Sequence, residues 1–283
     1  MRGLNLMSLF KALILGIVQG LTEFLPVSSS AHLVFVQHLF GLREPLVFFA
    51  VILHLGTLAG LLVYFAADLA HLVRDSIYGI VYLIRRKPLQ EISEIAPYSR
   101  WALGILVATL PTALMGIFFK DWFESLFGSL QAVAIGLLGT TLILWLTRYF
   151  QKNEKGMDRS RYLDYFVIGV FQGIAIIPGI SRSGATISAA LFRGLKREEA
   201  FRFSFLLAIP AILGAGLLEF KEGIRVWEWG APPLLAGFFA SALFGYLSLH
   251  FLARITRQGK LHLFAVYTLA LSLLIIFLSP RLE

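Results

Sequence analysis

This 283-residue sequence has no cysteine and few charged residues. The absence of cysteine excludes disulfides, thiolate catalysis and Cys-ligated metals, and it leaves the redox compartment undetermined. Charged residues make up only 15% of the chain and hydrophobic residues 58%, which is more apolar surface than a soluble fold could bury. No linker or low-complexity stretch separates parts of the chain, and residues 151–161 form the only candidate hinge. The composition therefore predicts one polytopic membrane domain over residues 1–283.

Six apolar windows without an interior charge come close to the roughly 20 residues that a helix needs to cross a bilayer. They are Leu46–Ala66, Trp101–Phe119, Leu130–Leu146, Phe203–Leu218, Pro232–Leu252 and Leu261–Leu278. These windows predict an all-α integral membrane protein with six transmembrane helices.

A pattern that occurs twice breaks two further apolar segments, Leu6–Phe40 and Tyr162–Phe192. The first contains QGLTEFLPVSSSAH and the second QGIAIIPGISRSGAT, with the two Gln-Gly pairs 153 residues apart. Each copy places Pro and small polar residues at membrane depth, which predicts a re-entrant helix pair whose turn faces protein or a wet cavity. We expect two repeats, over about residues 5–149 and 158–278.

Basic residues fix the expected orientation. Seventeen of the 25 Lys and Arg residues lie in residues 67–100, 148–161, 193–202 and 254–260, between apolar windows. The net charge of +8 thus indicates the positive-inside rule and membrane lipids, rather than nucleic acid. With these segments cytoplasmic, each half has three full spans and the halves are inverted copies. The first re-entrant pair then opens outside and the second to the cytoplasm, and residues 67–99 suit an interfacial helix.

Three ionisable residues lie inside the broken segments: Glu23, His32 and Arg182. A charge at membrane depth costs about 3 kcal/mol, so such residues usually pair or line a functional site. A Glu23–Arg182 ion pair that only joins the halves is one explanation. Gln19 shares a helix face with Glu23, four residues on, and the two offer oxygen ligands to a divalent cation (Mg2+ or Ca2+) or a polar contact between helices.

The first turn ends in three serines, Ser28, Ser29 and Ser30, at the start of the second half-helix. One serine is enough to cap a helix, and three at its positive end favour an anion site as well. His32 follows Ser29 by three residues, which predicts that the imidazole reaches the hydroxyl as a base reaches a nucleophile. A packed core histidine is the alternative.

The second turn, PGISRSGAT, combines glycines for close backbone approach with hydroxyl groups and a fixed cation. Its donors are Ser181, Arg182, Ser183 and Thr186. Because arginine binds phosphate oxygens bidentately and a helix N-terminus adds N–H groups, this turn predicts a phosphate-binding cradle. His54 and Glu219, in or near full spans, are expected to be packing or interfacial residues.

Together these residues resemble the undecaprenyl-diphosphate phosphatases linked to bacitracin resistance. QGLTEFLPVSSSAH matches that family's (E/Q)XXXE motif and hydroxyl-rich turn, and PGISRSGAT matches its PGXSRSXXT motif. Length, repeat spacing and number of spans agree over essentially the whole chain. The first position of the (E/Q)XXXE motif is glutamine here, Gln19, so a metal site would have one carboxylate fewer. Glu23 would then be its only carboxylate ligand from this motif.

The resemblance implies a multi-pass enzyme of the bacterial inner membrane that hydrolyses undecaprenyl diphosphate to undecaprenyl phosphate and inorganic phosphate, for peptidoglycan synthesis. Ser29 would attack the terminal phosphorus, His32 would take its proton, and Arg182 would hold the transferring oxygens. Glu23, with Gln19, would hold the divalent cation. The remaining phosphate-binding residues would be Ser28, Ser30, Ser181, Ser183 and Thr186. The first pair opens outside, so the active site is expected to face the periplasm or cell exterior.

Two alternatives stay open for the chemistry. His32 could itself be the nucleophile. Inverted repeats with broken helices are also the architecture of secondary transporters, so a carrier or flippase for a lipid phosphate is the competing function. A transporter needs no nucleophile, and the Ser-Ser-Ser-Ala-His sequence opposite Ser-Arg-Ser favours the enzyme. The sequence does not distinguish a monomer from a homodimer.

Overall fold

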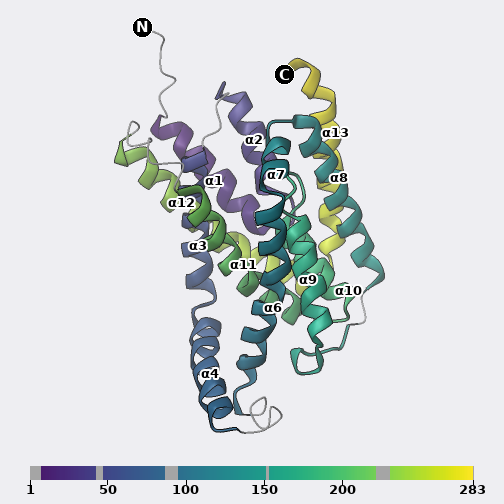
Figure 1. Ribbon diagram of the computed structural model, residues 1–283. Helices are drawn as coiled ribbons and strands as arrows, with labels where there is room; N and C mark the ends of the chain where they lie inside the picture. The colour runs from purple at the N-terminus through teal and green to yellow at the C-terminus, as the bar shows by residue number, and fades with distance from the viewer. Residues whose placement is uncertain (1–7, 43–46, 87–94, 151–152, 221–229, 283) are drawn as a thin grey trace.

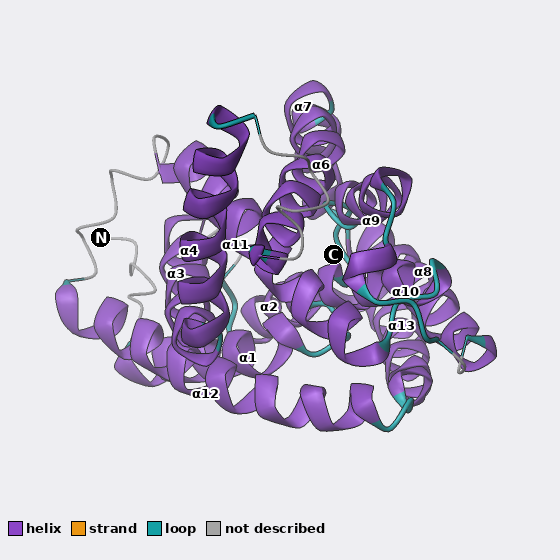
Figure 2. Ribbon diagram, turned by 90° about the horizontal axis from the view of Figure 1, so that it is seen from below, coloured by secondary structure: helices purple, strands orange, loops and turns teal. Residues whose placement is uncertain are grey.

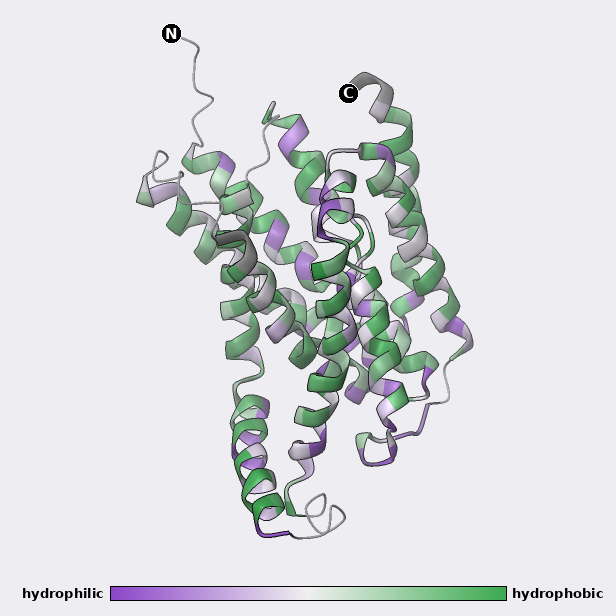
Figure 3. Ribbon diagram, viewed as in Figure 1, coloured by the Kyte–Doolittle hydropathy of each residue, from purple (hydrophilic) through white to green (hydrophobic). Residues whose placement is uncertain are grey.

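The structure is a computed structural model that describes residues 8–42, 47–86, 95–150, 153–220 and 230–282. Helices make up most of the described chain, and Figure 2 shows them in purple with short teal loops between them. Within these ranges the one β-type pairing is an isolated bridge between Lys155 and Leu195. In Figure 3 hydrophobic colour covers most of the helical length. The expected class, an all-α integral membrane protein, is confirmed.

Figure 1 shows the described helices in chain order, coloured from purple at the N-terminus to yellow at the C-terminus. They are α1 (Leu9–Phe24), α2 (Ser29–Leu39), α3 (Val47–Tyr64), α4 (Ala66–Ile84), α6 (Pro97–Phe118), α7 (Lys120–Phe127), α8 (Leu130–Leu146), α9 (Tyr162–Ile174), α10 (Arg182–Phe192), α11 (Arg197–Phe220), α12 (Ala231–Arg257) and α13 (Phe264–Leu282), with short 3-10 turns at Thr147–Tyr149, Met157–Arg159 and Leu261–Leu263.

Five helices among the described residues are long and apolar enough to cross a membrane. They are Pro97–Phe118, Leu130–Tyr149, Arg197–Leu217, Ala231–Arg257 and Leu261–Ser279. A sixth candidate is α3 together with α4, which meet at a bend of 76°. The predicted first span, Leu46–Ala66, thus corresponds to α3, and part of the segment that suited an interfacial helix forms α4. The number of spans is therefore five or six.

Each copy of the repeated pattern forms two helices separated by a turn. Pro26 follows α1 closely, and the residue before a proline is disfavoured in a helix, so α1 ends there. Ser28 caps α2 and Ser181 caps α10, each accepting a hydrogen bond from the backbone N–H three residues on. The glycines that follow the two pairs, Gly41 and Gly194, both have a positive φ. Caps and glycines are each 153 residues apart, so the backbone repeats with the sequence.

Glycines let the first helix of each pair approach a long helix of the other half. Gly16 and Gly20 of α1 lie against α12, and Gly169 and Gly173 of α9 lie against α6. A Cβ added to Gly20 would lie 2.8 Å from the Cβ of Phe244, so no larger residue fits without displacement. These glycines too are 153 residues apart, and they bring each helix pair into the opposite half.

The two broken pairs lie one above the other. In Figure 1, α1 and α2 lie above α9 and α10, and a hydrogen bond from the backbone N–H of Gly179 to Ser30 joins the two turns. α8 and α13 pack side by side, joined by a 2.8 Å hydrogen bond from Ser272 Oγ to Ala134 O and one of 2.8 Å between the hydroxyls of Thr141 and Thr268. Of these two helices, α8 also contacts α2 and α10, so it lies beside both pairs.

Candidate active site

The turns of the two helix pairs meet inside the bundle. The backbone N–H of Gly179 donates to Ser30 Oγ at 3.4 Å. At the start of α10, a Cβ on Gly184 would lie only 3.3 Å from the Cβ of Pro26, so the second turn rests directly on the first. Residues predicted for one site from two distant parts of the sequence are thus neighbours.

The carboxylate of Glu23, whose side chain is 5% exposed, is the centre of this region. Its Oε1 accepts a hydrogen bond from Arg182 Nη2 at 2.7 Å. Its Oε2 accepts one from Ser29 Oγ at 2.6 Å and one from Gln19 Nε2 at 2.9 Å. One carboxylate therefore receives donors from both halves of the chain and compensates the charge of a largely buried guanidinium.

His54 reaches the same carboxylate from α3. Its Nε2 lies 3.6 Å from Glu23 Oε2, and its Nδ1 lies 2.7 Å from the carbonyl oxygen of Ala50. A carbonyl accepts hydrogen bonds only, so Nδ1 carries a proton and Nε2 faces the carboxylate. The expectation that His54 is a packing or interfacial residue is thereby corrected. The side chain of Glu219, the other residue given that role, lies outside the described residues.

We call this group the Glu23 cluster. Its members are Gln19, Glu23, Ser29, His54 and Arg182. Sequence reasoning missed His54, although the rule that selected Glu23, an ionisable residue inside an apolar segment, applies to it equally.

His32 lies next to the Glu23 cluster, but its ring binds other groups than Ser29. Nδ1 is 2.8 Å from the carbonyl oxygen of Ser28, and Nε2 is 2.7 Å from the hydroxyl of Tyr267 on α13. The two rings are nearly parallel, with centroids 5.7 Å apart. Because both ring nitrogens are occupied, the predicted contact between the imidazole and Ser29 is replaced by one with Tyr267. No sequence signal marked Tyr267, a tyrosine in an ordinary apolar span.

The other predicted hydroxyls flank the cluster in equivalent pairs. Ser28 Oγ lies 3.0 Å from Ser30 Oγ, and Ser181 Oγ lies 3.2 Å from Ser183 Oγ. The fifth, Thr186, is fully buried and donates to the carbonyl oxygen of Arg182 at 2.9 Å. Thr186 therefore supports the backbone behind Arg182, whereas the four serines lie at the N-terminal ends of α2 and α10.

Two buried atoms of the Glu23 cluster have no hydrogen-bond partner within the described part of the chain, Gln19 Oε1 and Arg182 Nη1. Arg182 can thus hold Glu23 with Nη2 and still donate to a phosphate oxygen with Nη1. Gln19 Oε1 and the Glu23 carboxylate are the type of oxygen that binds Mg2+ or Ca2+, which fill their remaining positions with water and substrate phosphate. Among the described residues no group of three His, Cys, Asp or Glu could hold a metal ion. A cation here would therefore depend on few protein ligands.

Comparison with known proteins places this chain next to one family. Residues 12–274 match the family model described as bacitracin resistance protein BacA. A protein of Carboxydothermus hydrogenoformans named undecaprenyl-diphosphatase is 45% identical over 277 residues, which cover 96% of this chain and 98% of that protein. Proteins of the same name from Alkaliphilus metalliredigens and Methanosphaera stadtmanae are 41% and 40% identical, over 96% and 97% of this chain and 99% of each relative. None of these names supports the transporter alternative.

Proposed function

Because the chain belongs to the family of the bacitracin resistance protein BacA, we propose that it hydrolyses undecaprenyl diphosphate to undecaprenyl phosphate and inorganic phosphate. This reaction recycles the lipid carrier of peptidoglycan synthesis. The observation that carries the proposal is the Glu23 cluster, in which one carboxylate holds a serine hydroxyl from one half and an arginine from the other. A nucleophile and a phosphate-binding cation are thereby held side by side.

In the mechanism that this geometry supports, Ser29 Oγ attacks the terminal phosphorus. A bond forms from Oγ to phosphorus, the bond from phosphorus to the bridging oxygen breaks, and undecaprenyl phosphate leaves. The proton of Ser29 passes to Glu23 Oε2, its nearest acceptor at 2.6 Å, rather than to His32. Water then attacks the phosphoserine, the bond from phosphorus to Ser29 Oγ breaks, and Glu23 returns its proton to Oγ. Inorganic phosphate leaves, the water proton passes to phosphate or solvent, and the serine hydroxyl and the Glu23 carboxylate are restored.

Arg182 supplies the positive charge that the transferring phosphoryl group requires. The transition state spreads negative charge over the phosphoryl oxygens, and a preorganised donor in a dry site stabilises it more than the ground state. Arg182 Nη1 is free of partners in the described structure, and Nη2 is fixed by Glu23 at 2.7 Å, which sets the direction of the guanidinium. The serines at 28, 30, 181 and 183 add neutral donors around it.

A divalent cation, Mg2+ or Ca2+, fits beside Glu23 and Gln19. Gln19 is fully buried and its Oε1 has no partner among the described residues, as expected of an oxygen that faces a ligand site. Such a cation would neutralise diphosphate charge. Glu23 and Gln19 would hold it, and the carboxylate would still orient Ser29.

The fold supports an arrangement of six spans and two re-entrant pairs, built from inverted repeats over residues 5–149 and 158–278. Three observations support this arrangement. The helix caps Ser28 and Ser181 are 153 residues apart, and so are the glycines that follow the two pairs. The glycines by which α1 packs on α12 also lie 153 residues before those by which α9 packs on α6. With the basic segments in the cytoplasm, the first turn opens to the periplasm or cell exterior and the protein lies in the bacterial inner membrane. The diphosphate enters between the halves while the polyprenyl chain stays in the bilayer.

The test of the function is phosphate release from a polyprenyl diphosphate by the purified protein, with and without EDTA. Wild type is expected to turn over in the presence of divalent cations, and Ser29→Ala and Arg182→Ala are expected to lose at least 100-fold. Binding of the lipid without any phosphate release by the wild type would refute the proposal.

Ser30→Cys tests the orientation of the protein in the membrane. The introduced thiol is expected to react with an impermeant thiol reagent added from outside the cell. Labelling only from the cytoplasmic side would mean that the first turn opens to the cytoplasm.

A further inference from the structure

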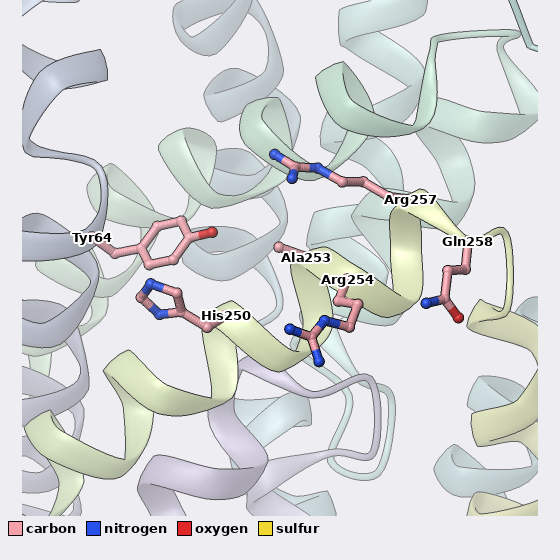
Figure 4. A pocket seen from close by; sticks show the side chains of 6 residues that line it. All are labelled: Tyr64, His250, Ala253, Arg254, Arg257 and Gln258. Atoms are coloured by element: carbon pink, nitrogen blue, oxygen red, sulfur yellow. The ribbon is translucent and has the colours of Figure 1, made fainter.

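A cavity of about 400 Å3 lies at the C-terminal end of α12, apart from the Glu23 cluster. Figure 4 shows Tyr64 from α3 facing the side chains that α12 contributes to it. It is lined by Tyr64, His250, Ala253, Arg254, Arg257 and Gln258. Tyr64 is ten residues beyond His54 on α3, about 15 Å along the helix, so the cavity and the Glu23 cluster are separate sites.

The lining of this cavity is basic and contains no acidic residue. Arg254 is exposed, and within the described ranges no hydrogen bond or ion pair engages its guanidinium. Arg257 donates to Glu198 at 3.1 Å, so its charge is partly compensated. Arginines in the last turn of a helix also interact favourably with the negative end of the helix dipole. That interaction alone would not explain why a cavity and further polar side chains lie beside them.

Aromatic rings form the opposite wall and offer further donors. The rings of His250 and Tyr64 meet edge to face with centroids 4.7 Å apart, and His250 packs on Tyr246 at 4.6 Å. His250 Nδ1 lies 3.0 Å from the carbonyl oxygen of Tyr246, so the ring proton is on Nδ1 and the imidazole serves as wall rather than as a donor to the cavity. Two guanidinium groups, the phenol of Tyr64 and the amide of Gln258 therefore supply the donors around one space, a set suited to phosphate oxygens.

An apolar ridge leads along α12 to this cavity. Every fourth residue of the helix from Leu235 is exposed by half or more, namely Leu235, Phe239, Leu243, Leu247 and Phe251. The next side chains on this face are Arg254 and Gln258. From Leu243 to Arg254 the helix rises about 16 Å, close to the depth of one leaflet of the hydrocarbon core. The ridge thus has the length and polarity of an acyl chain that ends in a charged headgroup.

We propose that the cavity binds the phosphate-bearing headgroup of an anionic phospholipid, whose acyl chains lie along Leu243, Leu247 and Phe251. The uncompensated charge of Arg254 selects an anionic headgroup over a zwitterionic one. The ridge selects a lipid over free inorganic phosphate, because inorganic phosphate has no acyl chain to lie along the apolar side chains.

The test uses the full-length protein in detergent and native mass spectrometry, titrated with phosphatidylglycerol and, separately, with phosphatidylcholine. Arg254→Gln is expected to lower affinity for phosphatidylglycerol about fivefold and to leave phosphatidylcholine binding unchanged. The matched control is Arg159→Gln, an exposed arginine outside the cavity whose Nε lies 3.7 Å from an Asp158 oxygen, and it should behave as wild type. Phosphatase activity and a single size-exclusion peak show that each variant is folded.

Two results would overturn the proposal. An equal loss of phosphatidylglycerol in both arginine variants would mean that surface charge alone retains the lipid. Displacement of the lipid by millimolar inorganic phosphate, with no effect of Phe251→Ala on affinity, would mean that the cavity binds free phosphate and that the ridge plays no part. Reduced binding of both lipids in Phe251→Ala would support the contact with acyl chains.

Discussion

Glu23 binds the two residues that occupy the same position in the two halves. Ser29 and Arg182 are 153 residues apart, each is the first residue of the second helix in its pair, and each donates to one oxygen of this carboxylate. The position equivalent to Glu23 in the second half is Ile176, and the position equivalent to His32 is Ala185. The repeat therefore supplies the geometry, whereas the chemistry depends on differences between the two copies.

A double-variant experiment separates a catalytic role of the Glu23–Arg182 pair from a purely structural one. Glu23→Gln leaves a buried guanidinium without its anion and is expected to cost about 3 kcal/mol of stability and at least 100-fold in activity. Glu23→Gln with Arg182→Met removes both charges, so the thermal midpoint in detergent should recover while phosphate release does not. Recovery of both would mean that the pair only joins the halves.

His54 is expected to contribute to turnover through Glu23. His54→Gln keeps a polar side chain on α3 but removes the imidazole nitrogen that lies 3.6 Å from Glu23 Oε2, so phosphate release should fall at least tenfold. The matched control is His38→Gln, because His38 on α2 has the same contact with the carbonyl oxygen four residues back, at 2.9 Å, and lies outside the Glu23 cluster. Equal activity of the two variants would exclude His54 from the site.

Tyr267 is expected to position His32. Tyr267→Phe retains the ring that stacks on the imidazole but removes the hydroxyl 2.7 Å from Nε2, so the imidazole loses its fixed orientation. His32 Nδ1 lies 2.8 Å from the carbonyl oxygen of Ser28, next to Ser29, so a loosened imidazole is expected to disturb the backbone that positions Ser29. We expect kcat to fall by about tenfold with little change in KM, whereas Tyr149→Phe, an exposed ring beside Arg148, should leave both unchanged. Wild-type kcat in Tyr267→Phe would show that the orientation of His32 does not matter.

At the scale of elements, the packing of α1 on α12 depends on glycine. The expected result of Gly20→Ala is a lower thermal midpoint, because the added Cβ would lie 2.8 Å from both the Cβ of Phe244 and the backbone N of Gly245. Gly214→Ala on α11 is the matched control, since among the described residues no other part of the fold lies within 4 Å of its added Cβ, and alanine favours a helix by up to about 1 kcal/mol. An unchanged midpoint for Gly20→Ala would contradict close packing at this contact.

How far the sequence predicted these elements depended on the kind of signal. Proline and hydroxyl residues in each repeated pattern predicted the breaks that the structure has at Pro26 and before Ser181, because caps and proline act locally. The boundary between α3 and α4 lies within two residues of the predicted end of the first span at Ala66, because the apolar run stops there. The angle of 76° was not predicted, since no proline marks the bend. His54 and Tyr267 were missed for another reason: their partners lie 31 and 235 residues away in the sequence, and only the fold brings them together.

At the scale of the whole molecule, both helix pairs pack against longer helices, and their turns meet inside the bundle. α1 packs on α12 and α9 on α6, so each turn is held by helices of the other half. The site is thus complete only when both halves are folded together. An enzyme of the membrane gains from this arrangement, since the polar turns are buried against protein and their backbone groups need not face hydrocarbon.

The measurement that tests the central claim most directly is rapid quenching of the purified enzyme during turnover of a polyprenyl diphosphate labelled in its terminal phosphate, followed by peptide mapping. We predict label on the peptide that contains Ser29, and no label at this position in Ser29→Ala. Arg182→Ala should accumulate far less label, since the oxygens of the transferred phosphoryl group lose the guanidinium that stabilises their charge. Full turnover by the wild type with label on His32, or with no covalent label, would contradict the assignment of Ser29 as the nucleophile held between the two halves.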